Sequence, residues 1–192
     1  MSPDDRRAAI VEAVIPLLAQ HGSAVTTRQM AGAACVAEGT IFKVFPDKYA
    51  LIQEALKVAM DPGPVQKQMA AIDPDAPFEE KLRTAAGILL RRLEDLIAWT
   101  AVLRTMPPVD GAAPTGLPPF IAGANAAIVA SLTTLFEGHR DTLRLPPARA
   151  AVIFLGLLFA AGHLAGTVGQ RLTIEEIVGV LQSGIVAEEE RS

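Results

Sequence analysis

The sequence predicts an all-α protein in two unequal parts, and three observations support this fold class. No convincing alternation of apolar and polar residues with the period of a β-strand occurs along the 192 residues. Apolar residues instead recur every three or four positions, which is the spacing of one helix face. Residues 61–80, rich in proline, separate a shorter N-terminal run of such patterns from a longer C-terminal run. We therefore expect one domain over residues 4–61 and a larger one over 62–192.

The first helix is predicted over residues 6–21, with Gly22 following as a helix-ending residue. Pro16 lies inside this helix and should bend it, because proline has no N–H to bond the carbonyl of Glu12. The apolar residues that share one face of the helix are Ile10, Val14, Leu17 and Leu18.

Two short helices are predicted next, separated by three residues. Thr26 and Gln29 have the spacing of a capping box, in which each side chain bonds the backbone N–H of the other residue. This predicts a helix over 26–34 and a second helix over 38–45, which Pro46 ends.

Longer helices are expected beyond these. Asp47 can cap a fourth helix, whose apolar residues are Leu51, Ile52, Ala55, Leu56 and Met60. After the proline-rich segment, the spacing predicts one long helix over 82–103, and the prolines and glycines of 107–119 predict a loop. Thr173 and Glu176 have the spacing of a second capping box. The remaining helices are expected at 120–140, 147–168 and 174–189.

The composition excludes several classes of protein. Apolar residues make up 51% and charged residues 20% of the chain, which excludes a disordered protein. The single cysteine, Cys35, excludes an internal disulfide. No phosphate-binding loop, HExxH motif or nucleophile elbow occurs, so we expect no catalytic site, metal or cofactor. The net charge is −4, so any nucleic-acid binding must come from a local surface.

Residues 26–45, TTRQMAGAACVAEGTIFKVF, place the two short helices in the pattern of a helix-turn-helix motif. The second helix of such a motif can enter the DNA major groove. Gly39 and Ala31 are small, which permits the two helices to approach closely. The apolar contacts between the helices are expected from Met30, Ala31, Ala34, Val36, Ile41 and Phe45.

This motif and the following GTIFKVFPDKYAL segment resemble the DNA-binding segment of TetR-family transcriptional regulators, over roughly residues 6–56. The resemblance implies a dimer, most simply a repressor, that binds a pseudo-palindromic operator and is released by a small molecule. Lys43 is the candidate base-edge donor to guanine or, failing that, a phosphate contact, and Lys48 occupies the place of a lysine near phosphate. The implied DNA-binding residues are Thr26, Arg28, Glu38, Gly39, Thr40, Phe42, Lys43 and Lys48.

Four residues depart from the family's pattern. Cys35 stands where glycine is frequent, which predicts a strained or altered turn. Ala37 stands where serine or threonine often caps the second helix, which removes about 1 kcal/mol of capping. Glu38 replaces a frequent basic residue, and Phe42 replaces a frequent tyrosine. Residues 1–60 carry six basic and six acidic side chains, so their non-specific attraction to DNA should be weak. Specific binding should therefore depend on two motifs in a dimer.

In the C-terminal part the resemblance implies dimerisation through the last two long helices and an apolar ligand pocket among the earlier ones. The expected dimer contacts are Val152, Leu155, Phe159, Ile177 and Leu181. The expected ligand-binding residues are Leu89, Leu93, Trp99, Thr100, Met106, Phe120, Asn125, Phe159 and His163, with Ser131 as a further polar group. We expect a mainly apolar ligand, and the alternative is a small acid paired with Arg91, Arg92 or Arg104.

Two other functions stay open. Residues 150–170 carry no charged side chain and could span a bilayer, as in a membrane-tethered DNA-binding protein. The glycines of this stretch and the lack of an aromatic belt favour a buried helix and no membrane partner. The second alternative is a small helical enzyme with a helix-turn-helix-like core, which no residue supports. The polar, acidic N-terminus is unlike a signal peptide, so we expect the cytoplasm.

Overall fold

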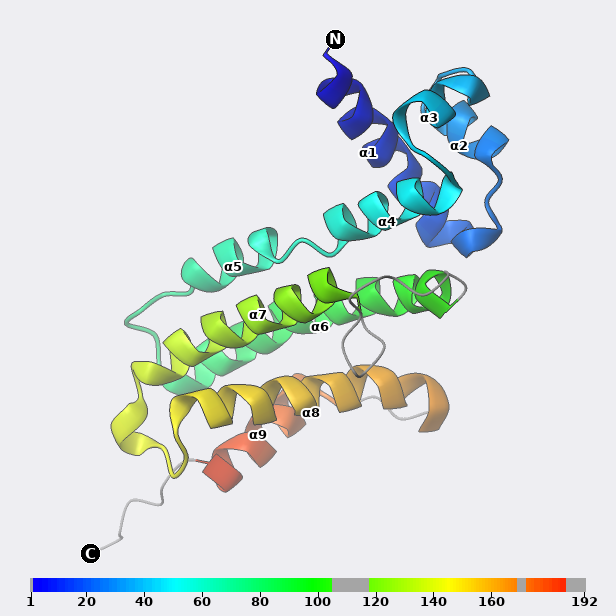
Figure 1. Ribbon diagram of the computed structural model, residues 1–192. Coiled ribbons are helices and arrows are strands. Elements are labelled where there is room, and N and C mark those ends of the chain that lie inside the picture. The colour runs from blue at the N-terminus through cyan, green and yellow to red at the C-terminus, as the bar shows by residue number, and fades with distance from the viewer. Residues whose placement is uncertain (1, 105–117, 169–171, 186–192) are drawn as a thin grey trace, which may run out of the picture. The chain divides into compact units, whose positions relative to one another are not determined.

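The computed structural model describes residues 2–104, 118–168 and 172–185 (Figure 1). Over these ranges the chain forms α-helices, two short 3₁₀ helices and no β-strand, which confirms the predicted all-α class. The α-helices are α1 (Pro3–His21), α2 (Thr27–Ala33), α3 (Glu38–Val44), α4 (Lys48–Ala59), α5 (Gly63–Ala70), α6 (Phe78–Arg104), α7 (Pro119–Glu137), α8 (Pro147–Val168) and α9 (Ile174–Ile185).

The chain divides into two compact units. The first comprises Met1–Asp61 and Asp95–Ala122, and the second comprises Pro62–Glu94 and Gly123–Ser192. The sequence assigned residues 95–122 to the C-terminal part, whereas those that the structure describes pack with the first unit. The reason is that Trp99, Val102 and Ile121 are buried in one cluster with residues of α1, α2 and α4.

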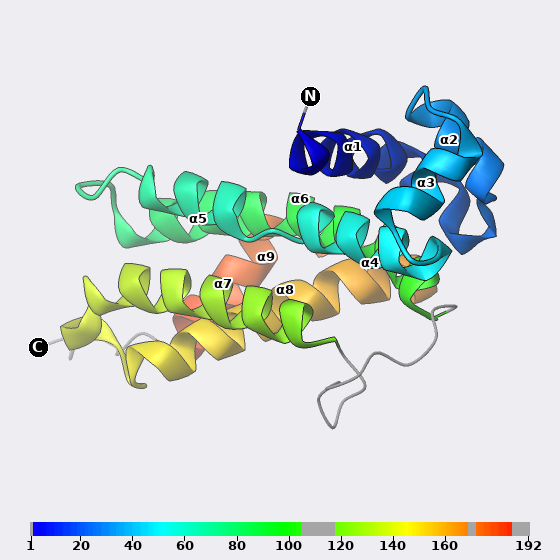
Figure 2. The same cartoon turned by 45° about the horizontal axis from the view of Figure 1, so that its top comes forward.

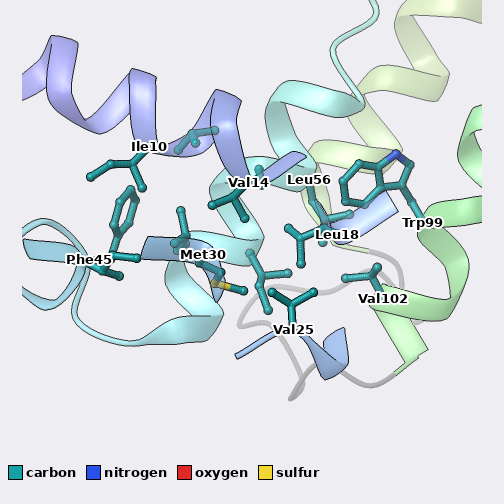
Figure 3. Packing of buried hydrophobic residues seen from close by; sticks show 14 of the residues in the cluster. Ile10, Val14, Leu18, Val25, Met30, Phe45, Leu56, Trp99 and Val102 are labelled. Carbon is teal, nitrogen blue, oxygen red and sulfur yellow. The ribbon is translucent and has the colours of Figure 1, made fainter. Parts of the chain in front are cut away.

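The core of the first unit is built largely by α1, α2 and α4, as Figure 3 shows. The apolar face predicted for α1 is buried at Ile10, Val14 and Leu18, and the helix continues through Pro16 to His21. The residues predicted to join the two short helices also lie in this core. Met30, Ala31, Ile41 and Phe45 are buried, and Ala34 and Val36 pack half-buried against them.

The second unit contains α5, the first part of α6, most of α7, and α8 and α9 (Figure 2). An edge-to-face series of rings joins three helices, with Phe136 of α7 at 5.7 Å from Phe78 and 6.1 Å from Phe154, between ring centroids. The prolines of 61–80 led us to expect only a boundary there, but α5 forms between them. Its first turn accommodates a proline, because the N–H that proline lacks has no partner within the helix at that position.

One helix of the described part, Pro119–Glu137, is long and apolar enough to cross a bilayer by length and composition. The uncharged stretch that the sequence singled out gives only a shorter apolar segment, Pro147–Gly162, within the described residues. A core helix of a soluble protein meets the same criterion, so this helix is weak evidence for a membrane.

Candidate nucleic-acid interface

The first short helix, α2, begins at the predicted capping box. The Thr26 hydroxyl accepts a hydrogen bond from the backbone N–H of Gln29 at 3.2 Å. The backbone N–H of Thr26 donates to Oε1 of Gln29 at 2.8 Å. Because both donors would otherwise lack partners, this pair fixes the residue at which α2 starts. Arg28, one residue into the helix, is exposed.

The turn between α2 and α3 contains a strained residue. Cys35 has a φ of +53°, in the left-handed region that favours glycine. This backbone conformation lets the N–H of Val36 donate to the carbonyl of Ala31 at 3.0 Å and close the turn. Cys35 itself is exposed. The strain expected at this position is therefore located in the backbone of one residue.

The two faces of α3 differ sharply in burial. Ile41 is fully buried and Phe45, directly after the helix, is 1% exposed, so these two residues anchor α3 in the core. Phe42 is 52% exposed although it is a large apolar residue. The exposed face carries the residues that the sequence assigned to DNA, namely Glu38, Gly39, Phe42 and Lys43, and Thr40 is half-buried at its edge.

Glu38 links the two helices of the motif. Its carboxylate accepts a hydrogen bond from the hydroxyl of Thr27 at 2.6 Å. It also lies in the first turn of α3, where a negative charge is stabilised by the helix dipole. Ala37 supplies no side-chain hydrogen bond at the N-cap, as expected, so Glu38 is the polar residue that stabilises this end of α3.

Arg7 of α1 holds the other end of α3. Its guanidinium donates to the carbonyl of Val44 at 3.0 Å, stacks over the ring of Phe45 at 4.4 Å, and lies 3.9 Å from the carboxylate of Glu54. A cation at a helix C-terminus is favoured by the helix dipole. Sequence reasoning missed this role of Arg7, because only the folded chain brings residues 7, 44 and 54 together.

The basic side chains of the motif have different environments. Lys43 is exposed and makes no ion pair among the described residues. Lys48 is half-buried, and its ammonium donates to the carbonyl of Ser23 at 2.7 Å, which ties the start of α4 to the 3₁₀ turn (Gly22–Ala24) that follows α1. One of its three protons is therefore used within the protein.

The residues predicted for the ligand pocket are dispersed. Leu89 and Leu93 are buried in the second unit, Trp99 and Phe120 belong to the core of the first, Asn125 is half-buried, and Phe159 is 44% exposed. Met106 and the side chains of Thr100 and His163 lie outside the described residues. A pocket of about 510 Å³ lies in the second unit and has different walls. Of the predicted polar groups only Ser131 lines it.

The residues predicted for the dimer interface also separate by burial. Ile177 and Leu181 of α9 are 3% and 1% exposed, so they lie inside the subunit. Val152 and Phe159 of α8 are 55% and 44% exposed, and Leu155 is half-buried. Ile153 of α8 and Val180 of α9, which the sequence did not single out, add to the exposed apolar surface.

Comparison with known proteins identifies the fold. No protein-family model matches the sequence, and no curated protein sequence matches it either. Solved structures match across the chain at low identity. A structure from Mesorhizobium loti, assigned to the TetR family of transcriptional regulators, is 18% identical with a TM-score of 0.72, over 97% of this chain and 100% of that one.

Two further structures agree. A TetR-family transcriptional regulator from Streptomyces coelicolor is 14% identical with a TM-score of 0.68, over 95% of this chain and 80% of that one. The flavonoid-responsive regulator FrrA is 20% identical with a TM-score of 0.65, over 97% and 100% of the two chains. The arrangement of helices is therefore the TetR fold, as the motif in residues 26–45 suggested.

Proposed function

We propose that this chain, which has the fold of TetR-family transcriptional regulators, is itself a transcriptional regulator that binds operator DNA as a homodimer. The observation that carries the proposal is the exposed face of α3. A helix anchored by buried Ile41 and Phe45 presents Gly39, Phe42 and Lys43 together on one face open to solvent.

The chemistry of this face suits the major groove. Lys43 can donate to the O6 and N7 acceptors of guanine, and the ring of Phe42 can contact a thymine methyl group. Gly39 has open space where a Cβ would stand, so the backbone of α3 can approach the DNA closely there. Thr26, Arg28 and Lys48 would contact the phosphates beside the groove.

A second copy of this chain would provide the second recognition helix. Among the described side chains of α8 and α9, the large apolar residues that are exposed are Val152, Ile153, Phe159 and Val180, and each is at least 38% exposed in the single chain. Figures 1 and 2 both show α8 and α9 side by side, so these residues belong to neighbouring helices. A two-fold interface across them would place two α3 helices on a pseudo-palindromic operator.

A small molecule would control this binding, most simply by releasing a repressor from its operator. The structural neighbour FrrA is described as flavonoid-responsive, and the second unit of this chain contains a pocket of ligand size. The ligand would favour a state of the dimer in which the two α3 helices no longer match the groove spacing. It can do so only through different affinities for the two states. We propose no enzymatic activity.

Selection of bound duplexes from a random-sequence library tests the DNA-binding proposal. We expect the selected sequences to share two inverted half-sites about one helical turn apart. Lys43→Ala should change the preferred base within each half-site, whereas Lys67→Ala, an exposed lysine of α5, should leave the selected sequence unchanged. Recovery of sequences without a common site would contradict the proposal.

A further inference from the structure

A pocket of the second unit is lined by residues of α5 and the segment after it, by Lys81 near the start of α6, and by residues in and just after the second half of α7. Figure 1 labels these helices. The pocket's volume of about 510 Å³ falls within the range that holds drug-sized molecules. Apolar and polar groups share its walls. The lining residues are Gln66, Met69, Ala70, Ile72, Asp73, Pro74, Lys81, Ser131, Thr134, Leu135 and Gly138.

Lys81 is the cation of this lining. Its ammonium donates to the carbonyl of Pro74 at 2.6 Å and lies 3.3 Å from Nε2 of His139, which leaves one of its three protons for another acceptor. Among the described residues, no carboxylate lies within 4.0 Å of this ammonium. The neighbouring Arg83, by contrast, is paired with Glu79 one turn earlier on α6. Within the part of the chain that the structure describes, the half-buried positive charge of Lys81 thus has only neutral partners.

His139 does not add a second positive charge near neutral pH. Its ring stacks on Phe78, with 4.2 Å between centroids, and this burial together with the charge of Lys81 lowers the pKa of the imidazole. A neutral imidazole can accept a hydrogen bond from the ammonium. The positive charge therefore stays on Lys81.

Three other polar side chains of the lining make hydrogen bonds within the chain. Ser131 and Thr134 donate their hydroxyl protons to the carbonyls of Ala127 and Ala130 on the preceding turn of α7, at 3.2 Å in both cases. Asp73 is exposed, and its carboxylate accepts from the backbone N–H of Asp75 at 2.9 Å. The hydroxyl oxygens can still accept hydrogen bonds, and the ammonium of Lys81 is the positively charged group of the lining.

We propose that this pocket is the effector site of the regulator proposed above, and that it takes a small amphipathic organic carboxylate. The carboxylate would bind Lys81, and the apolar body would pack on Met69, Ile72 and Leu135. This inference rests on the proposed function for its regulatory role, but the binding itself is independent of DNA. It places the acid at Lys81, away from the arginines that the sequence suggested for this ligand class.

The test compares a charged and a neutral probe of the same shape, 4-phenylbutyrate and 4-phenylbutanamide, by calorimetry on the full chain at pH 8. We expect wild type to bind the carboxylate at least about tenfold more tightly than the amide, as for a hydrogen bond to a charged group. Lys81→Met should remove this preference, and Lys81→Arg should keep it. Arg83→Met is the matched control on the same helix and should behave as wild type, because Arg83 does not line the pocket.

Ala70→Trp provides a variant that fills the pocket without altering its charge, because Ala70 is an exposed lining residue. It should abolish binding of both probes. Equal affinity of wild type for the two probes, a preference that survives Lys81→Met, or binding that survives Ala70→Trp would overturn the inference. If the chain binds 4-phenylbutyrate through Lys81 but selects no DNA, the binding site is supported and the regulatory function is contradicted. If the chain selects an operator but binds neither probe, the regulatory function is supported and the binding site is contradicted.

Discussion

The strained turn of the helix-turn-helix motif gives the sharpest prediction for stability. Cys35 has a φ of +53° and is exposed, so its side chain makes no buried contact that would be lost on substitution. A left-handed conformation costs a non-glycine residue about 1–2 kcal/mol. Replacement by glycine removes this cost. It also gives the unfolded chain more conformational freedom, which lowers the free energy of unfolding by about 0.4–1 kcal/mol. We therefore expect Cys35→Gly to raise the free energy of unfolding of the first unit by about 0.8 kcal/mol.

Urea titration followed by tryptophan fluorescence measures this change. The single tryptophan, Trp99, is 4% exposed and belongs to the same core as α1 and α2, so its emission reports on the unit that contains Cys35. With a slope of about 2–3 kcal/mol/M, the midpoint should rise by roughly 0.3–0.4 M.

Two control variants separate the backbone effect from other causes. Cys35→Ala removes the thiol but keeps the left-handed strain, so its free energy of unfolding should stay within about 0.5 kcal/mol of wild type, as for an ordinary surface substitution. Ala33→Gly, in the last turn of α2, should lower stability by about 0.5–1 kcal/mol. The reasoning is refuted if Cys35→Gly is no more stable than Cys35→Ala.

Four further predictions follow from the structure. Ala37→Ser should supply the missing N-cap of α3 and raise the free energy of unfolding of the first unit in urea by about 1 kcal/mol, and an unchanged value would show that Glu38 already satisfies this helix end. Arg7→Met should lower that free energy of unfolding by about 1 kcal/mol and should also lower operator affinity, whereas Arg6→Met, at an exposed neighbour, should leave the stability unchanged; equal effects of the two would exclude a specific role for the contact with Val44. Lys43→Ala should weaken operator binding about tenfold with no change in the midpoint, and unchanged affinity by fluorescence anisotropy would move base recognition to other residues of α3. Burial and the charge of Lys81 lower the pKa of His139 in the folded state below its ordinary value of 6.5, so its stabilising contribution is present above pH 6.5 and is lost as the pH falls below it. His139→Gln should therefore flatten the pH dependence of thermal unfolding between pH 5 and 7, and an identical pH profile would contradict this.

The sequence predicted the elements that local chemistry determines. The capping box at Thr26 is confirmed, and so is the one at Thr173, whose hydroxyl accepts from the N–H of Glu176 at 3.1 Å. α8 has the predicted bounds, 147–168. Each of these features depends on residues within a few positions of one another, so a single sequence contains the necessary information. The same signal at Ser2, which caps α1 in a box with Asp5, was available and overlooked.

Features that depend on distant residues were not predictable in this way. The arginine that holds the end of α3 joins residues 7, 44 and 54, and the pocket joins residues 66–74, 81 and 131–138. Trp99 was expected in a ligand pocket, but the structure buries it in the first unit, since α6 extends into the core of α1 and α4. The apolar stripe of α9 was expected to face a second subunit at Ile177 and Leu181, and it faces the interior of its own. Hydrophobic spacing shows that a face is buried but does not show what covers it.

The central claim is that the exposed face of α3 recognises a specific DNA site, and one titration tests it most directly. Full-length protein, purified without detergent, is titrated against a labelled fragment from upstream of its own gene at two salt concentrations. The account predicts that the protein binds this fragment more tightly than random DNA and that the affinity falls steeply with salt. Lys43→Ala should lose the preference for the fragment over random DNA. A soluble dimer that binds this fragment no better than random DNA, and selects no site from the library, would contradict it.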